Sequence, residues 1–138
     1  MRVAILHDNL FSTLERGDTR IMKGFGYFTP NDSDVGVHAK DFVDDNWDSA
    51  EREKVIKYLL SCHSTGNSCF ERLPCYICNE YDVLSSQDMV DGEWIFPEAL
   101  VHYVEQHSVV PTEPFLEHIR KNYYMVPILP DNFTMPDL

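Results

Sequence analysis

Cys75-Tyr-Ile-Cys78 and His102-Tyr-Val-Glu-Gln-His107 combine two thiols with two imidazoles, in a C-x2-C and an H-x4-H pattern. Two cysteines separated by two residues bring their sulfurs to one point, and two histidines at a helix end complete a tetrahedron around Zn²⁺. We therefore predict one structural zinc ion bound by Cys75, Cys78, His102 and His107. A site with four protein ligands leaves no position open for chemistry.

The spacing leaves the ligand set open in two respects. On an ideal helix His102 and His107 lie about 140° apart, so they meet only if the last turn is distorted or His107 lies beyond the helix. Upstream, Cys62, His63 or Cys69 could replace one of the histidines. The alternatives to a metal site are buried free thiols beside ordinary helical histidines, or disulfides.

A catalytic zinc site is a second interpretation. Pro74-Cys75-x-x-Cys78 has the form of the second half of the zinc deaminase signature, in which three ligands hold a water and a glutamate transfers protons. The first half requires H-x-E, whereas the nearest candidate is His38-Ala39-Lys40, and lysine cannot serve as that carboxylate. The C-x2-C pair also lacks a surrounding thioredoxin-like βαβ pattern. The sequence favours a protein that is not an enzyme, without catalytic residues.

The composition fits one small acidic domain. With 138 residues, 43% of them hydrophobic, the chain is long enough for a single modest core. Its 23 acidic residues against 11 Lys and Arg give a formal charge of -12, which disfavours nucleic acid and suits a basic protein partner. The apolar start at 1–6 is too short for a signal peptide, and no run approaches the ~18 apolar residues of a membrane span. We expect a cytoplasmic protein.

A helix over residues 48–61 is the clearest element. Asp48 or Ser49 is placed to cap its first turn, and Gly66 follows as the expected breaker. The apolar stripe that we expect to face the core consists of Val55, Ile56, Leu59 and Leu60.

A hairpin and a second helix follow the cysteine turn. The dipeptide Asp91-Gly92 separates two short apolar runs and predicts a type I′ turn at the surface, with Asp91 and Glu93 exposed. Pro97 suits the first position of a helix over 97–106, because its missing N–H has no partner there in any case. A third helix is predicted from 112–114 to about Tyr123.

Weaker patterns occupy the remaining parts of the chain. Residues 2–6 and 20–28 are predicted as strands, 41–48 as an acidic connector, and the proline-rich segment after Met125 as an extended tail. Four aromatic residues are expected to form an apolar shell around the metal site rather than an exposed binding face: Trp47, Trp94, Phe96 and Tyr103.

These elements predict an α+β fold, a small single domain with a short hairpin and three helices, stabilised by zinc. Residues 1–45 supply N-terminal strands and the connector, and 46–124 carry the first helix, the cysteine turn, the hairpin and two further helices. Residues 125–138 form the C-terminal tail.

The part from 46 to 118 resembles a group of small uncharacterised bacterial proteins, whose shared core is a CR-x-CG turn followed by DG-x-W-x-WPEGLAHYV-x-x-H. The chain departs from that core at Tyr76, Asn79, Phe96, Ala99 and Val101 and has an extra Cys69, but it keeps every proposed ligand. The residues that carry the resemblance are Asn46-Trp47, Ala50-Glu51-Arg52, Tyr58-Leu59-Leu60, Cys75-x-Ile-Cys78, Asp91-Gly92-Glu93-Trp94, Phe96-Pro97-Glu98-Ala99-Leu100, His102-Tyr103-Val104, His107, Phe115 and His118.

The resemblance implies the same fold and metal site and names no activity. The function expected from charge and ligands is an acidic intracellular protein-interaction module built around a structural zinc site. The alternatives are an inhibitor or nucleic-acid mimic that binds a basic partner, and a zinc-dependent hydrolase or deaminase-like enzyme. The sequence does not specify the oligomeric state.

Overall fold

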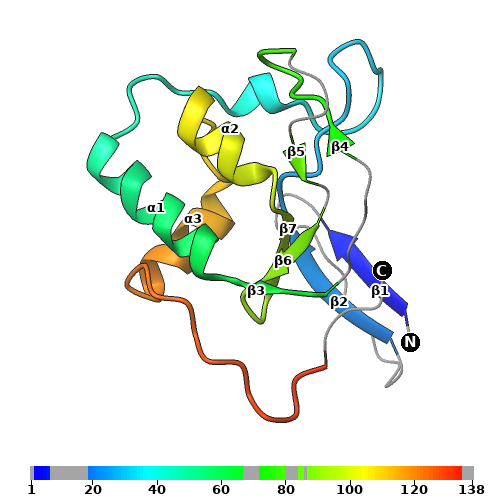
Figure 1. Cartoon of the computed structure of the whole chain (residues 1–138), viewed down its shortest axis with the longest axis vertical. Helices are drawn as coiled ribbons and strands as arrows, with labels where there is room; N and C mark the ends of the chain where they lie inside the picture. Colours follow the sequence, from blue (N-terminus) through cyan, green and yellow to red (C-terminus); the bar gives the residue numbers. More distant parts are fainter. Residues whose placement is uncertain (1, 7–18, 67–71, 80–83, 86, 135–138) are drawn as a thin grey trace.

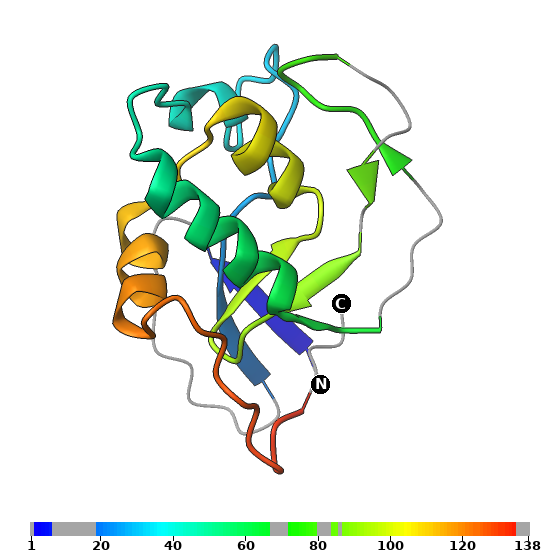
Figure 2. The same cartoon turned by 60° about the vertical axis from the view of Figure 1, so that its left-hand side comes forward.

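A five-stranded sheet in the order β1-β2-β7-β6-β3 forms one layer of the computed structural model, which describes residues 2–6, 19–66, 72–79, 84–85 and 87–134. Its strands are β1 (Arg2–Leu6), β2 (Thr19–Gly24), β3 (His63–Ser64), β6 (Asp88–Val90) and β7 (Trp94–Pro97). Three helices lie on one side of it (Figures 1 and 2), namely α1 (Ser49–Ser61), α2 (Leu100–His107) and α3 (Glu113–Lys121). The remaining elements are the 3₁₀ helix η1 (Ala39–Phe42) and a separate pair, β4 (Arg72–Leu73) with β5 (Leu84–Ser85).

The sheet is mixed. β1 with β2 and β2 with β7 are parallel, whereas β7 with β6 and β6 with β3 are antiparallel. The predicted α+β fold with a hairpin and three helices is confirmed, as is the strand at 2–6. In the described part of the chain, every helix is too short or too polar to cross a membrane.

The second strand is shorter than the predicted span 20–28, because β2 ends at Gly24. Gly26 has a φ of +101°, a conformation that favours glycine. A Cβ at this position would lie 3.1 Å from Cδ of Pro97 and 3.3 Å from Leu100. The chain therefore turns here against the junction of β7 and α2.

The β6–β7 hairpin is confirmed, but its turn is not the predicted one. Val90 pairs with Ile95, and the N–H of Asp91 donates to the carbonyl of Trp94 at 3.1 Å, which centres the turn on Gly92 and Glu93. Only Gly92 has positive φ (+111°), whereas a type I′ turn needs it at both central residues. The prediction was wrong because the side chain of Asp91, rather than its backbone, organises the turn.

Helix α1 begins as predicted, with the Asp48 carboxylate accepting a hydrogen bond from the N–H of Ala50 at 3.2 Å. Its buried face contains Tyr58 beside Val55 and Leu59, whereas Leu60 is 62% exposed, so the predicted stripe is wrong at Leu60.

Gly66 does not stop helix α1. The helix ends at Ser61, because Cys62 is already extended and leads directly into β3. Strand β3 then pairs with β6, with His63 opposite Val90. This long-range pairing ends the helix before the glycine is reached.

Helix α2 begins three residues later than the predicted span 97–106. Phe96 pairs with Met89 and Pro97 with Asp88, so the strand continues through the proline. A residue before proline avoids the helical region, which favours this extended path. The helix ends at His107, because Ser108 adopts the left-handed conformation with a φ of 53°.

Helix α3 ends before the predicted Tyr123. Tyr123 and Tyr124 have positive φ (56° and 58°), and Tyr123 is 83% exposed. The segment that follows contains no helix up to Thr134, as predicted, and it lies on the domain. Val126 packs against the main core and Phe133 against a smaller cluster formed by Met22, Val90 and Ile95.

The main core fills the space between the helices and the sheet. Trp94 of β7 stacks on Phe115 of α3 with ring centroids 4.5 Å apart and an interplanar angle of 11°. Phe96 and Tyr103 are also buried, so three of the four predicted aromatics belong to the core. Trp47 is half-buried at the edge of this core.

Candidate metal centre

The cysteine turn follows β4 and holds its first sulfur with backbone groups. The N–H groups of Ile77 and Cys78 point at Sγ of Cys75, at 3.4 and 3.5 Å, and the N–H of Asn79 donates to the Cys75 carbonyl at 2.9 Å. Asn79 has a φ of 61°, a conformation that asparagine tolerates better than most residues. Donors directed at the sulfur favour its thiolate form.

The two histidines come from α2. His107 is the last residue of the helix, and its ring centroid lies 5.1 Å from that of His102. The five-residue spacing is thus accommodated at the helix end, immediately before the left-handed Ser108. The sequence analysis predicted that the two histidines meet only if the last helical turn is distorted or the helix ends before His107.

All four predicted ligands meet. Their ligand atoms lie within 4.8 Å of one another, and we call these residues the Cys/His cluster: Cys75, Cys78, His102 and His107. Sγ of Cys75 is 3.4 Å from Nε2 of His107, and Sγ of Cys78 is 3.7 Å from Nε2 of His102. Sulfur and nitrogen on a tetrahedral Zn²⁺ are separated by about 3.6 Å, as follows from the usual bond lengths. The cluster is therefore close enough to bind a metal ion.

The cysteine turn is also attached to its surroundings through Tyr76. Its N–H donates to the hydroxyl of Tyr103 at 3.0 Å, and its carbonyl accepts a hydrogen bond from Nδ2 of Asn31 at 2.6 Å. Tyr103 follows His102 on α2, so the same helix turn supplies a ligand and an anchor. Burial raises the pKa of Tyr103, which keeps its hydroxyl protonated and hydrogen-bonding.

The two sulfurs differ in their access to solvent. Cys75 is completely buried, whereas Cys78 is exposed. A cavity of about 360 Å³ opens onto Cys78 and is lined by His102, Gln106 and His107. Burial raises the pKa of the Cys75 thiol, although the N–H groups of Cys78 and Ile77 act in the opposite direction. A bound divalent cation deprotonates a coordinating thiol outright.

The substitute ligands lie elsewhere. The thiol of Cys62 donates to the carbonyl of Tyr58 at 3.3 Å, and burial together with the charge of Asp91 raises its pKa. His63 lies 3.3 Å from the carbonyl oxygen of Pro127. Neither belongs to the Cys/His cluster, and Cys69 lies outside the described residues. The three described cysteines are free thiols.

His38, the nearest candidate for the deaminase H-x-E motif, does not belong to the cluster either. Its Nε2 lies 3.0 Å from the carbonyl oxygen of Ser33, and its Nδ1 lies 3.8 Å from a carboxylate oxygen of Asp41.

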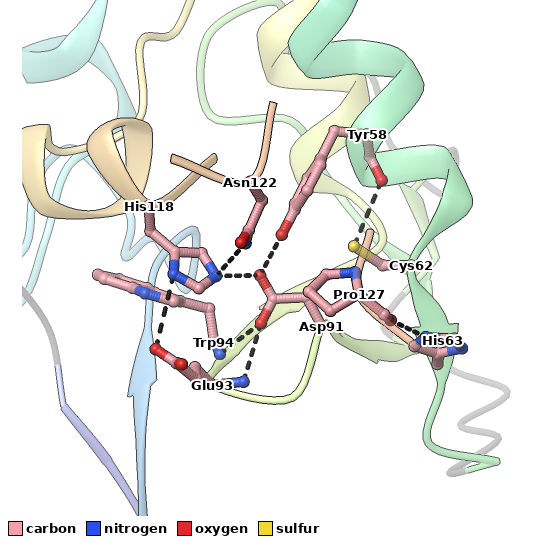
Figure 3. A network of polar contacts seen from close by, with 9 residues as sticks. All are labelled: Tyr58, Cys62, His63, Asp91, Glu93, Trp94, His118, Asn122 and Pro127. Carbon is pink, nitrogen blue, oxygen red and sulfur yellow. Dashed lines mark hydrogen bonds and ion pairs between the residues drawn. The ribbon is translucent and has the colours of Figure 1, made fainter. Parts of the chain in front are cut away.

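The sequence analysis did not predict a second group of interacting polar side chains, which Figure 3 shows. Asp91 was expected at the hairpin surface but is 2% exposed. Its Oδ2 accepts hydrogen bonds from the hydroxyl of Tyr58 at 2.6 Å and from Nε2 of His118 at 2.9 Å. Its Oδ1 accepts the N–H groups of Glu93 and Trp94 at 2.9 and 2.8 Å. We call these contacts the Asp91 network.

The Asp91 network is structural in character. Burial alone would raise the pKa of Asp91, but the hydrogen bonds from His118, Tyr58 and Glu93 lower it, so the carboxylate stays ionised inside the protein. Both oxygens are fully engaged and connect the hairpin turn to α1 and α3. Tyr58, Asp91 and His118 all belong to the residues that carry the bacterial resemblance, but their spacing gave no sign that they meet.

Comparison with known proteins adds no family to this picture: no protein-family model, curated protein or solved structure matches the chain. The chemistry of its own residues must therefore carry any functional conclusion.

Proposed function

We propose that the chain is an acidic protein-interaction module that binds one structural Zn²⁺ through Cys75, Cys78, His102 and His107. The observation that carries this proposal is the convergence of four ligand atoms within 4.8 Å of one another, contributed by a turn and a helix end that are distant in sequence. We also propose that the chain is related to the small bacterial proteins that share this ligand pattern.

The donor set favours zinc. Two thiolates and two imidazoles in a tetrahedral arrangement suit Zn²⁺, whereas magnesium and calcium prefer oxygen ligands. The contacts of 3.4 and 3.7 Å between sulfur and nitrogen match the edges of such a tetrahedron, and four protein ligands complete its coordination. The ion would then stabilise the fold rather than activate a water molecule.

The energetics support a structural role. Residues 72–79 lie outside the main sheet, and ordering them costs about 1–2 kcal/mol for each residue, or about 8–16 kcal/mol together. A structural zinc site supplies ~10–16 kcal/mol at neutral pH. The two magnitudes are comparable, so the ion is able to fix this turn on α2, which the hydrogen bonds of Tyr76 alone would not achieve.

The charge supports a basic protein as the partner. A formal charge of -12 produces a negative potential that accelerates encounter with a positive surface and opposes the approach of nucleic acid. Such an association weakens as salt is added, because the charges that guide it are screened beyond about 8–10 Å.

Metal content tests the proposal first. Elemental analysis of protein purified without chelators is expected to give one zinc ion per chain, and a chelator is expected to lower the melting temperature sharply. A stoichiometry near zero under these conditions would overturn the zinc site.

Salt dependence then tests the interaction. A protein captured at low salt is expected to be basic and to dissociate progressively as sodium chloride is raised. Displacement of that protein by duplex DNA would favour the alternative of a nucleic-acid mimic. Binding that does not change with salt would contradict a charge-guided partner.

A further inference from the structure

We infer that the Cys/His cluster is a modification site for hydroperoxides, at which Cys78 reacts first and Cys75 then closes a disulfide that releases the metal. The inference rests on the proposed zinc site and adds a chemical reaction to it. Three observations carry it: the unequal exposure of the two sulfurs, their unequal hydrogen bonding and the cavity beside Cys78.

The hydrogen bonds make the two sulfurs chemically different. The backbone N–H groups of Ile77 and Cys78 point at the sulfur of Cys75 and occupy part of its surface, so less of this sulfur is available to an electrophile. The sulfur of Cys78 lies 3.7 Å from Nε2 of His102, a longer contact than the 3.4 Å between Cys75 and His107. Metal binding keeps both sulfurs as thiolates, the nucleophilic form.

The two sulfurs also differ in how easily a peroxide can reach them. Hydrogen peroxide is barely larger than water and fits easily into the cavity of about 360 Å³ that opens onto Cys78. Cys75 is fully buried, so a peroxide cannot reach it while the turn is in place. The buried thiol of Cys62 is a poor competitor, because its surroundings hold it in the unreactive protonated form.

The reaction balances without any other reagent. The thiolate of Cys78 attacks one peroxide oxygen, the O–O bond breaks, and hydroxide leaves to take up a proton as water, which yields a sulfenic acid. The sulfur of Cys75, less than 4.8 Å away, then attacks that sulfenic sulfur and displaces a second hydroxide, which is also protonated. Two thiolates lose two electrons in all, and the peroxide is reduced to two water molecules.

Disulfide formation removes two of the four ligands, so the ion loses its site. The turn would then be held mainly through Tyr76, by its bonds to Asn31 and Tyr103. A cavity of about 140 Å³ lies between Leu73 and Tyr76 of this segment and the residues Pro97 and Tyr103. Loosening the turn would expose more of these apolar walls to solvent.

The first experiment treats the zinc-loaded full chain with hydrogen peroxide and follows released zinc with a chelating dye. Peptide mapping is expected to show a Cys75–Cys78 disulfide that forms in step with zinc release, and dithiothreitol with added zinc should restore the loaded protein. When dimedone is present from the start, its adduct should accumulate on Cys78 of the wild-type protein and not on Cys75.

Two variants sharpen the test. Cys78→His offers a fourth ligand at the exposed position but no sulfur to oxidise, so it should bind zinc and lose it no faster with peroxide than without. Cys62→Ser removes a thiol outside the cluster and should release zinc at the wild-type rate. Rapid release from Cys78→His, first modification at Cys75, or a disulfide to Cys62 or Cys69 would overturn the inference.

The two proposals fail in different ways. A protein that never contains zinc refutes the metal site itself. A protein that binds zinc but retains it through peroxide treatment refutes only the reaction at Cys78.

Discussion

The Cys/His cluster and the Asp91 network each attach a turn to helices, but they do so with different interactions. The cluster joins residues 75–78 to α2 beside an open cavity, and the network joins the hairpin turn to α1 and α3 inside the protein. The cluster would need an ion from solution, whereas the protein itself supplies hydrogen bonds to both oxygens of Asp91. Stability should therefore depend on metal at one region and be independent of metal at the other.

Cys75→Ser should have the largest effect. Structural zinc contributes about 10–16 kcal/mol in small finger domains, which is comparable to the whole stability of a typical domain of about 5–15 kcal/mol. We expect this variant to contain no zinc and to melt at a sharply lower temperature, as is also expected for the wild type in chelator. His63→Gln, outside the cluster, serves as the control and should bind zinc normally. A Cys75→Ser variant that melts like the wild type would show that a metal ion does not stabilise this region.

Asp91→Asn should be next in size. The amide keeps the shape of the carboxylate but loses its charge, so Tyr58 and His118 face a weaker acceptor in the interior. Hydrogen bonds to a charged acceptor contribute about 1.5–3 kcal/mol each, and we expect a loss of about 3 kcal/mol in urea unfolding of the zinc-loaded protein. Zinc content should remain unchanged, and a variant that also loses zinc would show that the two regions are coupled.

The sequence predicted the Cys/His cluster but not the Asp91 network. Paired cysteines and paired histidines are local patterns, and few arrangements other than a metal site use them. Asp91 meets Tyr58 across 33 positions and His118 across 27, and neither partner lies at a spacing that predicts the contact. An aspartate before a glycine also predicts an exposed turn, so the pattern indicated the wrong environment.

In the fold, too, local sequence patterns predicted some elements, whereas long-range pairing determined others. Helix α1 was predictable because its cap and its apolar period are local features. The start of α2 was not, because the pairing of Phe96 with Met89 keeps the chain extended through Pro97. The end of α1 at Ser61 was predicted, but its cause was not, since β3 pairs with β6 before the chain reaches Gly66.

Glu51→Gln tests a third connection, which lies between α1 and α3 but is more exposed than the Asp91 network. Arg120 binds both oxygens of Glu51 at 2.8 and 3.0 Å, and the hydroxyl of Tyr124 and the indole N–H of Trp47 also donate to this carboxylate. Because Arg120 is 37% exposed, water screens the ion pair, and we expect a loss of only about 1.5 kcal/mol at neutral pH.

The effect of Glu51→Gln should depend on pH. The hydrogen bond from Arg120, with those from Tyr124 and Trp47, lowers the pKa of Glu51 to about 2 against its usual 4.5. A lowered pKa gives stability that is fully present above pH 4.5 and is lost as the pH falls towards 2. The difference in unfolding free energy between wild type and variant should therefore shrink over this range. A difference that stays constant between pH 6 and 2 would exclude the ion pair as its source.

Leu60→Gln should have the smallest effect and tests how the Asp91 network orients α1. A local apolar pattern placed Leu60 in the core beside Leu59, but Tyr58 turns inward to reach Asp91 and leaves Leu60 62% exposed. A polar side chain there should change the unfolding free energy by no more than about 0.5 kcal/mol, whereas Leu59→Ala, at a fully buried position, should cost about 3 kcal/mol. Equal losses in both variants would mean that the apolar stripe, and not the bond from Tyr58 to Asp91, sets the face that α1 presents to the core.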